Sequence, residues 1–500
     1  MLRIKMTKYV SIALITLTVL SCSSKKTELT WTKNLSQIGS QSSPKAADLN
    51  NDGVFDIIMG AGKNEYQESS QGVIAFDGKT GELIWQHATI DQIYGSATLL
   101  DVNEDGVKDV FIGGRSNQFY AINGKTGEGI WRWEYKYENH PKLKNAKYNF
   151  HNTVIIPDQN NDNTKDLLVV TGGNSKAAPN TTENRYAGIL MILNSKDGSV
   201  IAADTMPDGG ESYMPPLYFK QPDGSEHIVF GTGGETINGN LYLTTLEDLK
   251  SNDISRAKII SSDTSGHGYI APSVAVDLNG DSFYDIVSIS HGSKIAAVDG
   301  KSLNSLWTQS IPETESSNGF AVGNFNGDKT PDLFTFVSKG IWPQSTGSLQ
   351  IMLDGKTGNV AYTNTLGCTG FSSPVIYDLN DDGADEAIIS INEYDCDLGF
   401  TSPEEIEVKT KLLALDFRNN KVQQIEELAL FKNIFSTPWI GDLDSDGYLD
   451  IIHCQYFSPS ANLLAFLGMQ VKRISTSIKM DAPVKWGAYM GPEGNGVFTK

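Results

Sequence analysis

The sequence predicts an all-β protein folded as a β-propeller of about eight four-stranded blades. Three observations lead to this prediction: an Asp- and Asn-rich loop that recurs at regular intervals, a hairpin turn of the Asp-Gly-Lys-Thr-Gly type after most copies of that loop, and a strand-like segment near the N-terminus that has no partner nearby in the sequence. Four short strands per repeat, at this repeat length, are typical of a propeller blade.

The first recurring element is an apolar strand, the acidic loop and a second apolar strand. The first oxygen-bearing position of the loop falls at residues 48, 101, 158, 277, 324, 378 and 442. Successive copies lie 47 to 64 residues apart, except that the interval from 158 to 277 is 119 residues, or two periods. The copy within that interval is PPLYFKQPDGSEHIVFGTGG (215–234), which keeps Asp223-Gly224 but has Phe219 and His227 where the others have carboxylates. The chain therefore contains eight units.

The second element is a strand, a tight turn and another strand that often carries Trp, as in VIAFDGKTGELIWQ (73–86). Gly after Asp or Asn suits a tight hairpin. A unit thus reads as strand a, the Asp loop, strand b, a longer loop, strand c, the hairpin turn and strand d. The last unit, from Ser436, lacks such a hairpin. We expect ELTWTKNL (28–35) to supply its missing strand and remove a free sheet edge; seven blades is the alternative count.

The acidic loops have the composition that Ca²⁺ prefers. In D-x-N-x-D-G-x-x-D, side-chain oxygens at positions 1, 3, 5 and 9 converge, position 7 adds a carbonyl, and Gly at position 6 permits the sharp turn. An EF-hand needs Glu at position 12, and none of the seven loops has it. The predicted metal ligands are Asp48, Asn50, Asp52, Asp56, Asp101, Asn103, Asp105, Asp109, Asp158, Asn160, Asp162, Asp166, Asp277, Asn279, Asp281, Asp285, Asn324, Asn326, Asp328, Asp332, Asp378, Asn380, Asp382, Glu386, Asp442, Asp444, Asp446 and Asp450.

These loops, each running into a strand such as DIIMG, resemble the FG-GAP and VCBS repeats of integrin-like propellers over about residues 30–478. The resemblance implies Ca²⁺ as the cofactor, with up to seven ions. Departures at Asn324 (position 1), Asn163 and Ser282 (position 6) and Glu386 (position 9) imply weaker sites. The ligand positions carry 21 carboxylates, and seven Ca²⁺ would reduce the formal charge from −20 to about −6.

The N-terminus reads as an export signal with a lipidation site. Arg3, Lys5 and Lys8 precede an apolar run that ends in Val-Leu-Ser-Cys22. This resembles the lipobox of bacterial lipoproteins, which implies a signal peptide over 1–22, acylation of Cys22 and, with Ser23 rather than Asp next, an outer-membrane lipoprotein facing the periplasm or the surface. A plain signal peptide with an incidental Cys is the alternative. We expect a short linker at 23–28, the propeller at 29–478 and a C-terminal tail docked on it at 479–500.

The residues before each strand a and the loops between strands b and c are expected to share one face, opposite the Asp loops. Rigid scaffolds concentrate binding residues on such loops. The candidate ligand face is Tyr94, Arg115, His151, Tyr213, His267 and Tyr269. These side chains either bind a sugar or a peptide, or cap the channel. His151 and His267 are the candidates for acid–base chemistry, although no catalytic residue is assigned.

The cysteines are few. Cys368 precedes strand a of the seventh blade and Cys396 lies in its b-to-c loop. Both positions are on the same face, so we expect a disulfide between them in an oxidising compartment. Cys454 follows an apolar strand and is expected to be a buried thiol.

The sequence favours a secreted, lipid-anchored calcium-binding propeller that acts as a binding or scaffolding module at the cell envelope. The expected partner is an envelope protein or glycan, with membrane contact through the lipid anchor only; a charge of −20 disfavours nucleic acid.

Two enzyme classes are alternatives. The Asp-Gly-Lys-Thr-Gly turns and VKWGAYMGPEGNGVF (484–498) resemble the quinoprotein (PQQ-type) dehydrogenases, whose repeat also serves non-catalytic outer-membrane assembly scaffolds. Those enzymes carry adjacent cysteines, which this chain lacks, so no PQQ is expected. The other class is a polysaccharide lyase on a calcium-bearing propeller, with a Tyr, His or Lys base in an Arg-lined cleft.

Overall fold

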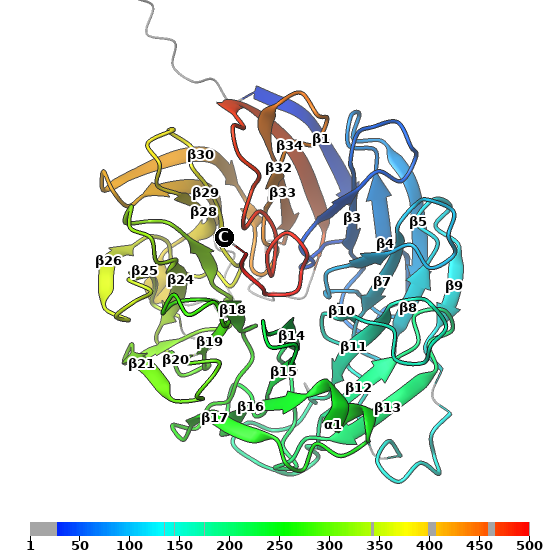
Figure 1. Ribbon diagram of the computed structural model, residues 1–500. Coiled ribbons are helices and arrows are strands. Elements are labelled where there is room, and N and C mark those ends of the chain that lie inside the picture. Colours follow the sequence, from blue (N-terminus) through cyan, green and yellow to red (C-terminus); the bar gives the residue numbers. More distant parts are fainter. Residues whose placement is uncertain are drawn as a thin grey trace, which may run out of the picture.

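The computed structural model describes residues 28–134, 136–144, 146–174, 176–341, 345–398, 407–458 and 466–499. Eight antiparallel sheets follow one another along the chain and form a closed ring around a central axis (Figure 1). The prediction of an eight-bladed propeller is therefore confirmed. The predicted signal peptide and Cys22 lie outside the described residues. Within the described residues, no helix combines the length and apolar character needed to cross a membrane.

Each of the first five blades has four strands paired in sequence order. Their bounds are β2 (Lys45–Ala47), β3 (Asp56–Gly60), β4 (Ser69–Phe76), β5 (Leu83–Thr89); β6 (Thr98–Leu100), β7 (Asp109–Gly113), β8 (Phe119–Ile122), β9 (Gly129–Arg132); β10 (Val154–Ile156), β11 (Asp166–Thr171), β12 (Ile189–Leu193), β13 (Val200–Thr205); β14 (Leu217–Lys220), β15 (Glu226–Gly231), β16 (Gly239–Thr245), β17 (Lys258–Asp263); and β18 (Val274–Val276), β19 (Asp285–Ile289), β20 (Lys294–Val298), β21 (Ser305–Ser310). A short helix, α1 (Leu246–Lys250), lies between β16 and β17. In Figure 1 the first strands β10, β14 and β18 lie nearest the axis.

The last three blades show small variations on this plan. In the sixth blade both β22 and β23 pair with β24, and in the eighth both β31 and β32 pair with β33. The bounds are β22 (Thr314–Glu315), β23 (Ala321–Gly323), β24 (Asp332–Lys339), β25 (Gly347–Leu353), β26 (Val360–Thr365); β27 (Val375–Tyr377), β28 (Glu386–Glu393), β29 (Lys409–Asp416), β30 (Lys421–Ala429); and β1 (Glu28–Ser36), β31 (Phe431–Lys432), β32 (Trp439–Gly441), β33 (Tyr448–Phe457), β34 (Gly468–Lys479), with the 3₁₀ turn η1 (Cys396–Leu398) in the seventh blade.

The ring is closed by the N-terminal strand, as predicted. β1 pairs antiparallel with β34, so that Trp31 lies opposite Arg473 and Ser36 opposite Gly468. Figure 1 shows β1 (blue) beside β34 (red-brown) in the same sheet. The eighth sheet thus draws its strands from both ends of the sequence and has no unpaired outer edge on β34.

Neighbouring blades are locked together by tryptophans on the fourth strands. Each indole Nε1–H donates to a carbonyl oxygen in the hairpin turn of the next blade, at 2.6 to 2.9 Å. The four pairs are Trp31 with Gly78, Trp85 with Gly124, Trp131 with Ser195, and Trp307 with Gly355. The ring also covers the last glycine of that turn: Gly358 has a φ of +71°, and a Cβ there would lie 2.4 Å from the Trp307 ring. The repeats contain both a turn glycine and a tryptophan because the tryptophan of one blade packs on the turn glycine of the next.

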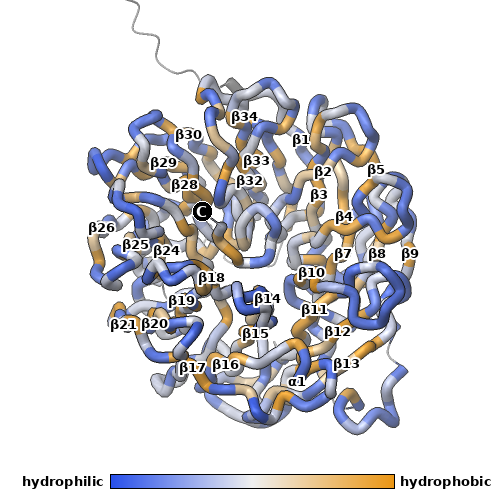
Figure 2. The backbone as a smooth tube through the Cα atoms, viewed as in Figure 1, coloured by the Kyte–Doolittle hydropathy of each residue, from blue (hydrophilic) through white to orange (hydrophobic). Residues whose placement is uncertain are grey.

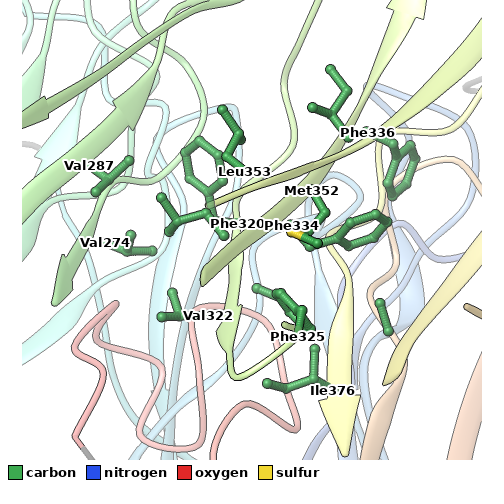
Figure 3. Close-up of a cluster of buried hydrophobic side chains, with 14 of the residues drawn as sticks. Val274, Val287, Phe320, Val322, Phe325, Phe334, Phe336, Met352, Leu353 and Ile376 are labelled. Atoms are coloured by element: carbon green, nitrogen blue, oxygen red, sulfur yellow. The ribbon is translucent and has the colours of Figure 1, made fainter. Parts of the chain in front are cut away.

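The hydrophobic core lies within and between the sheets. All five residues of β3, β7 and β19 are buried. Figure 3 shows how one cluster joins three blades, with Val274 and Val287 from the fifth, Phe334 from the sixth and Ile376 from the seventh. Figure 2 shows apolar residues along the strands and hydrophilic ones in the outer loops. The result is a rigid frame on which both sets of loops are held.

The C-terminal segment lies across the middle of the ring (red in Figure 1). Its backbone carbonyls accept hydrogen bonds from the first strands of three blades: Gly496 from Ala275, Trp486 from Ile376, and Gly487 from Ile440, at 2.8 to 3.0 Å. Trp486 is buried in the core that the fifth to seventh blades share. The tail therefore packs against the inner strands of the propeller.

In four blades a buried carboxylate at position 9 ties the Asp loop to the hairpin turn of the same blade. In the first blade Asp56 Oδ2 accepts from the Leu49 N–H (2.8 Å) and Oδ1 from the Gly78 N–H (3.0 Å). The same two bonds recur at Asp109, Asp285 and Asp332. Burial raises the pKa of Asp56 to about 6 and that of Asp332 to about 7, although the backbone bonds act in the opposite direction. One side chain thus positions two loops.

Replacing Asp56 with Ala would leave both N–H groups buried without an acceptor. Hydrogen bonds to a charged group contribute about 1.5–3 kcal/mol each, so we expect Asp56→Ala to lower the free energy of unfolding of the calcium-free protein by roughly 3–5 kcal/mol. Asp52→Ala is the matched control, because Asp52 belongs to the same loop but is exposed, and should cost less than about 1 kcal/mol. Urea unfolding in the presence of a chelator measures both, and equal losses would contradict the role given to Asp56.

Candidate functional site

The seven Asp loops are folded around their own side-chain oxygens. In the first loop, Asp48 accepts from the N–H groups of Asp52 (3.2 Å) and Gly53 (3.0 Å), and Asp52 Oδ1 accepts from Val54 N–H (2.9 Å). Positions 4 and 6 are left-handed there, with φ of 60° at Asn51 and 84° at Gly53. These bonds hold the oxygens of positions 1 and 5 inside the turn.

The pattern recurs around the ring. In all seven loops the side chain at position 1 accepts from a loop N–H, and the one at position 5 accepts from the N–H of position 7. Position 6 is left-handed in six loops, including two where it is not Gly, with φ of 67° at Asn163 and 73° at Ser282. In the loop 324–332, position 6 is Lys329, which is not left-handed, and the left-handed residue is Gly327 at position 4, with φ of 83°. Six of the loops are therefore similar in backbone shape, and the loop 324–332 differs from them at position 6.

The hairpin turn adds an acidic group that sequence reasoning missed. The amide of the position-3 Asn donates to the Asp that starts the turn, from Asn50 to Asp77 (3.3 Å) and from Asn279 to Asp299 (2.8 Å). In the seventh blade the turn residue Asp416 joins Asp382 and Glu386, each offering an oxygen within 4.8 Å of the others. The first Asp of the Asp-Gly-Lys-Thr-Gly turn is the sequence feature that could have revealed this group, but its pattern also fits a residue that only forms the turn.

In this cluster burial and the closeness of several carboxylates raise the pKa of one of them. Burial, followed by the negative charges of Asp416, Asp378 and Asp382, raises the pKa of Glu386 to about 8 despite a backbone bond from Leu379. A group of hard oxygen donors with an excess of carboxylates is the donor set that Ca²⁺ prefers.

The loop of the eighth blade differs from the prediction because a cation of the protein already lies in it. The Arg473 guanidinium, 3% exposed, donates to both oxygens of Asp450 (3.0 and 2.9 Å) and to Asp444 Oδ2 (2.5 Å). Two of its four predicted ligands are therefore neutralised by Arg473. Sequence reasoning could not find this arginine, because it comes from β34, outside the repeated motif.

The other loops differ from one another in whether a basic side chain lies beside their carboxylates. Lys196 Nζ donates to the Asp162 carbonyl oxygen (2.9 Å) and Arg418 to that of Asp382 (2.8 Å), each with the carboxylate of the same residue within 3.7 Å. In the part of the chain that the structure describes, no ion pair involves the carboxylates of loops 48–56 and 101–109. Each of these two loops therefore has three carboxylates at its predicted ligand positions without an ion-pair partner among the described residues.

Four of the six predicted ligand-face residues form one half-buried cluster. The Arg115 guanidinium lies 4.9 Å from the centre of the Tyr94 ring and forms an ion pair with Glu65. The His151 ring meets the Tyr213 ring edge-on, with centroids 5.8 Å apart. Burial and then the charge of Arg115 lower the pKa of His151 to about 4, so its ring is neutral at pH 7. Among the described residues, Tyr94 Oη and His151 Nε2 are buried without a hydrogen-bond partner.

The other two predicted residues lie apart from this cluster. Tyr269 is fully buried, packs with Met214 and Leu217, and donates its hydroxyl to Ser261 Oγ (2.7 Å). Its assignment to the ligand face is therefore corrected: the chain direction before β18 points this ring into the core. His267 is half-buried on the next part of the rim, where its ring lies 5.3 Å from that of His291.

A surface cavity of about 720 Å³ opens between the outer parts of the first two blades. Its lining includes Lys63, Glu68, His87, Tyr120 and Arg132. The His87 and Tyr120 rings meet edge-on at 5.4 Å, and Arg132 lies 5.8 Å from the Tyr120 ring centre. Sequence reasoning missed this cavity because no motif marks it: it forms only where strands of two blades converge.

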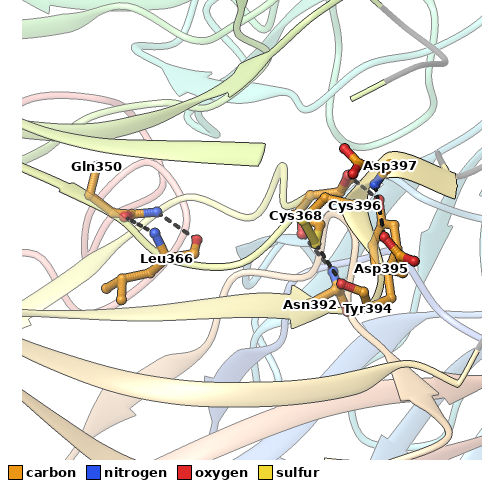
Figure 4. The surroundings of a disulfide bond; sticks show 9 residues. Gln350, Leu366, Cys368, Asn392, Tyr394, Asp395, Cys396 and Asp397 are labelled. Carbon is orange, nitrogen blue, oxygen red and sulfur yellow. Dashed lines mark hydrogen bonds between the residues drawn. A yellow bond between two sulfur atoms is a disulfide. The ribbon is translucent and has the colours of Figure 1, made fainter. Parts of the chain in front are cut away.

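A disulfide joins Cys368 to Cys396, the pairing expected from the sequence, with Cα atoms 5.3 Å apart. Figure 4 shows it linking the segment before β27 to η1, beside Tyr394 and Asn392. The Cys368 N–H also donates to the Asn392 carbonyl oxygen (2.8 Å). Cys454 is a buried free thiol whose pKa is raised by burial to about 12. The disulfide restrains the long b-to-c loop of the seventh blade.

Solved structures with a similar fold include two alcohol-oxidising enzymes. A europium-containing methanol dehydrogenase is 12% identical over 90% of this chain and 93% of its own, with a TM-score of 0.57. The quinohemoprotein alcohol dehydrogenase of Comamonas testosteroni is 10% identical over 92% of this chain and 78% of its own, with a TM-score of 0.53. BamB of Moraxella catarrhalis is 13% identical over 90% of this chain and all of its own, with a TM-score of 0.47.

At these identities the two dehydrogenases share the propeller fold alone with this chain, which agrees with the predicted likeness to quinoprotein repeats at the level of architecture. A search of curated protein sequences gave no match. The FAM234A/B beta-propeller family profile matches residues 73–374, more than half of the chain. The chain therefore belongs to the FAM234A/B β-propeller family.

Proposed function

We propose that this chain is a secreted, lipid-anchored, calcium-stabilised propeller that acts as a binding or scaffolding module at the cell envelope. The observation that carries the binding function is the cluster of Tyr94, Arg115, His151 and Tyr213, in which two buried polar atoms have no hydrogen-bond partner among the described residues. Buried polar groups are nearly always satisfied in native proteins. Atoms left over on a loop face, beside aromatic rings and an arginine, suit a polar ligand such as an envelope glycan or a peptide segment of an envelope protein.

Calcium in this proposal is structural. The side-chain oxygens at positions 1, 3 and 5, with the acidic residue of the hairpin turn where one is present, would hold the ion, while the position-9 carboxylate keeps the two loops together. A bound Ca²⁺ supplies the positive charge that the acidic turns lack. The arginine of the eighth blade supports this interpretation, because there the protein itself places a cation against the same carboxylates.

Metal removal tests the calcium proposal. In millimolar Ca²⁺, the range expected for extracellular modules, the melting temperature should be higher than in EGTA. Asp105→Asn should lower the number of bound ions by one, since the loop 101–109 has no ion pair within the described residues. Asp446→Asn, in the loop that holds Arg473, is the matched control and should leave the number unchanged. Equilibrium dialysis with metal analysis gives the counts. Identical melting temperatures with and without calcium would refute the proposal.

The lipid anchor rests on the resemblance of residues 1–22 to lipoprotein signals. Expressed in a bacterial host, the full chain should fractionate with membranes, and Cys22→Ser should release it to the soluble fraction, because the acyl chains attach through that sulfur. Ser23→Asp keeps the cysteine and should remain in membranes, shifted from the outer to the inner one. Retention of Cys22→Ser in the membrane fraction would contradict the anchor.

Tyr94→Phe tests the binding face, because it removes only the hydroxyl that lacks a partner. We expect binding to a panel of envelope glycans and isolated envelope proteins, measured by surface plasmon resonance, to weaken about 5- to 10-fold, the equivalent of one hydrogen bond of about 1–1.5 kcal/mol. Tyr456→Phe removes another buried hydroxyl without a partner, in the eighth blade, and serves as the control. Equal effects of both variants would argue against this face, and ultraviolet absorbance from an unsaturated product would indicate the lyase alternative.

A further inference from the structure

We propose that His267, His291 and Glu315 form a binding site for a transition-metal dication, with Zn²⁺ the best match. The three residues come from different parts of the ring: His267 from the connection between β17 and β18, His291 from the turn between β19 and β20, and Glu315 from β22 at the start of the sixth blade. Their ligand atoms all lie within 4.8 Å of one another. None belongs to an Asp loop, so this site is independent of the calcium proposal.

Both imidazole rings are held in the form that binds metal through Nε2. His291 Nδ1 lies 3.1 Å from the Ser316 carbonyl oxygen, and His267 Nδ1 lies 2.7 Å from that of Glu235. A carbonyl oxygen only accepts, so each Nδ1 must carry the proton. In the neutral rings the lone pair is then on Nε2. Metal-binding histidines commonly have this outer hydrogen bond to a backbone carbonyl, which fixes the tautomer and the ring orientation.

The site contains a buried nitrogen whose lone pair is not used in a hydrogen bond. His291 is 3% exposed, and its Nε2 is buried without a hydrogen-bond partner among the described residues. The nearest carboxylate oxygen, Glu315 Oε2, is 3.5 Å away, but the geometry is not that of a hydrogen bond. A buried nitrogen that faces a carboxylate and a second imidazole without bonding to either is the arrangement expected around an ion. An ordinary core histidine would use this atom in a hydrogen bond.

The local charge favours a cation. Glu315 is 5% exposed and Asp263, close to the same turn, 4%. Ser290 and Ser265 both bond to the Asp263 carboxylate, at 2.5 Å each. Asp263 thus places a negative charge just outside the three ligands.

The donor set distinguishes the metal. Two imidazoles and one carboxylate are suited to Zn²⁺ and its neighbours in the first transition row, whereas Ca²⁺ takes oxygen donors only. Tetrahedral bonds of about 2.0–2.1 Å would bring the ligand atoms to roughly 3.4 Å from one another. This requires the ligand atoms to approach one another by up to about 1.4 Å, and His267 can move because its ring is half-buried rather than enclosed. Three protein ligands leave a fourth position open for water or another ligand.

Co²⁺ substitution gives a direct test. The full chain, stripped of metal and then supplied with millimolar Ca²⁺ to occupy the Asp loops, is titrated with Co²⁺ while visible absorption is recorded. We expect the intense bands of low-coordinate Co²⁺ to appear at one equivalent and to be abolished by one equivalent of Zn²⁺. Isothermal titration with Zn²⁺ gives the affinity.

His267→Ala and Glu315→Gln should abolish these bands and weaken Zn²⁺ binding by more than roughly tenfold, because even outer-sphere changes cost 10- to 100-fold. His227→Ala removes a half-buried histidine of β15, outside both the ligand-face cluster and this site, and is the matched control, which should bind Zn²⁺ as the unaltered chain does. His267→Ala should keep its melting temperature in Ca²⁺, so that loss of metal is not loss of fold. Unaltered Zn²⁺ affinity in both ligand variants, or only the faint spectrum of six-coordinate Co²⁺, would overturn the proposal.

Discussion

In three blades the ring is held at one glycine of the hairpin turn, whose N–H and carbonyl oxygen are bonded to different blades. At Gly78 the N–H donates to the buried carboxylate of Asp56 in the same blade, while the carbonyl oxygen accepts from the Trp31 indole of the preceding blade. The equivalent glycines of the second and sixth blades, Gly124 and Gly355, are bonded in the same two ways. A Cβ at Gly78 would lie 1.8 Å from the Phe55 carbonyl oxygen, so no other residue fits. The same turn therefore holds the strands of its own blade in place and attaches that blade to the preceding one.

The bonds of the position-9 carboxylate explain why the acidic loop and the hairpin keep the same relative position in four blades. The carboxylate at position 9 fixes the distance between the two turns, and the remaining oxygens of the loop are then held near the first residue of the hairpin. The eighth blade shows what changes when the hairpin is missing. Its position-9 residue, Asp450, has no turn glycine to accept from and is instead bonded by Arg473 from β34, with Ser475 completing the set. The structural role is preserved with a different donor.

The parts of the molecule that repeat could be predicted from the sequence, whereas the parts that arise once could not. The blade count, the closing strand and the positions of the acidic loops all follow from periodic patterns. Arg473, the cavity of the first two blades and the His267–His291–Glu315 group depend on which blades meet side by side, and no local pattern in the sequence encodes that. Tyr269 was misplaced because counting back from strand a gives the position of a residue along the chain but not the direction of its side chain. His291 was not predicted as a site residue, because it follows β19 outside the Asp loop of its blade and no motif includes it.

The eighth sheet also constrains how the protein can be made. Its first strand is synthesised near the beginning of the chain and the partner of that strand near the end, with more than 430 residues between Ser36 and Gly468. During synthesis β1 must wait, unpaired, until almost all other blades have emerged. A product that stops before β34 would present open sheet edges on both sides of the gap, which is the kind of surface that pairs with other chains. Completion of the chain is thus required before β1 and β33 gain the strand that pairs with both of them, and incomplete chains differ from finished ones by these two unpaired edges.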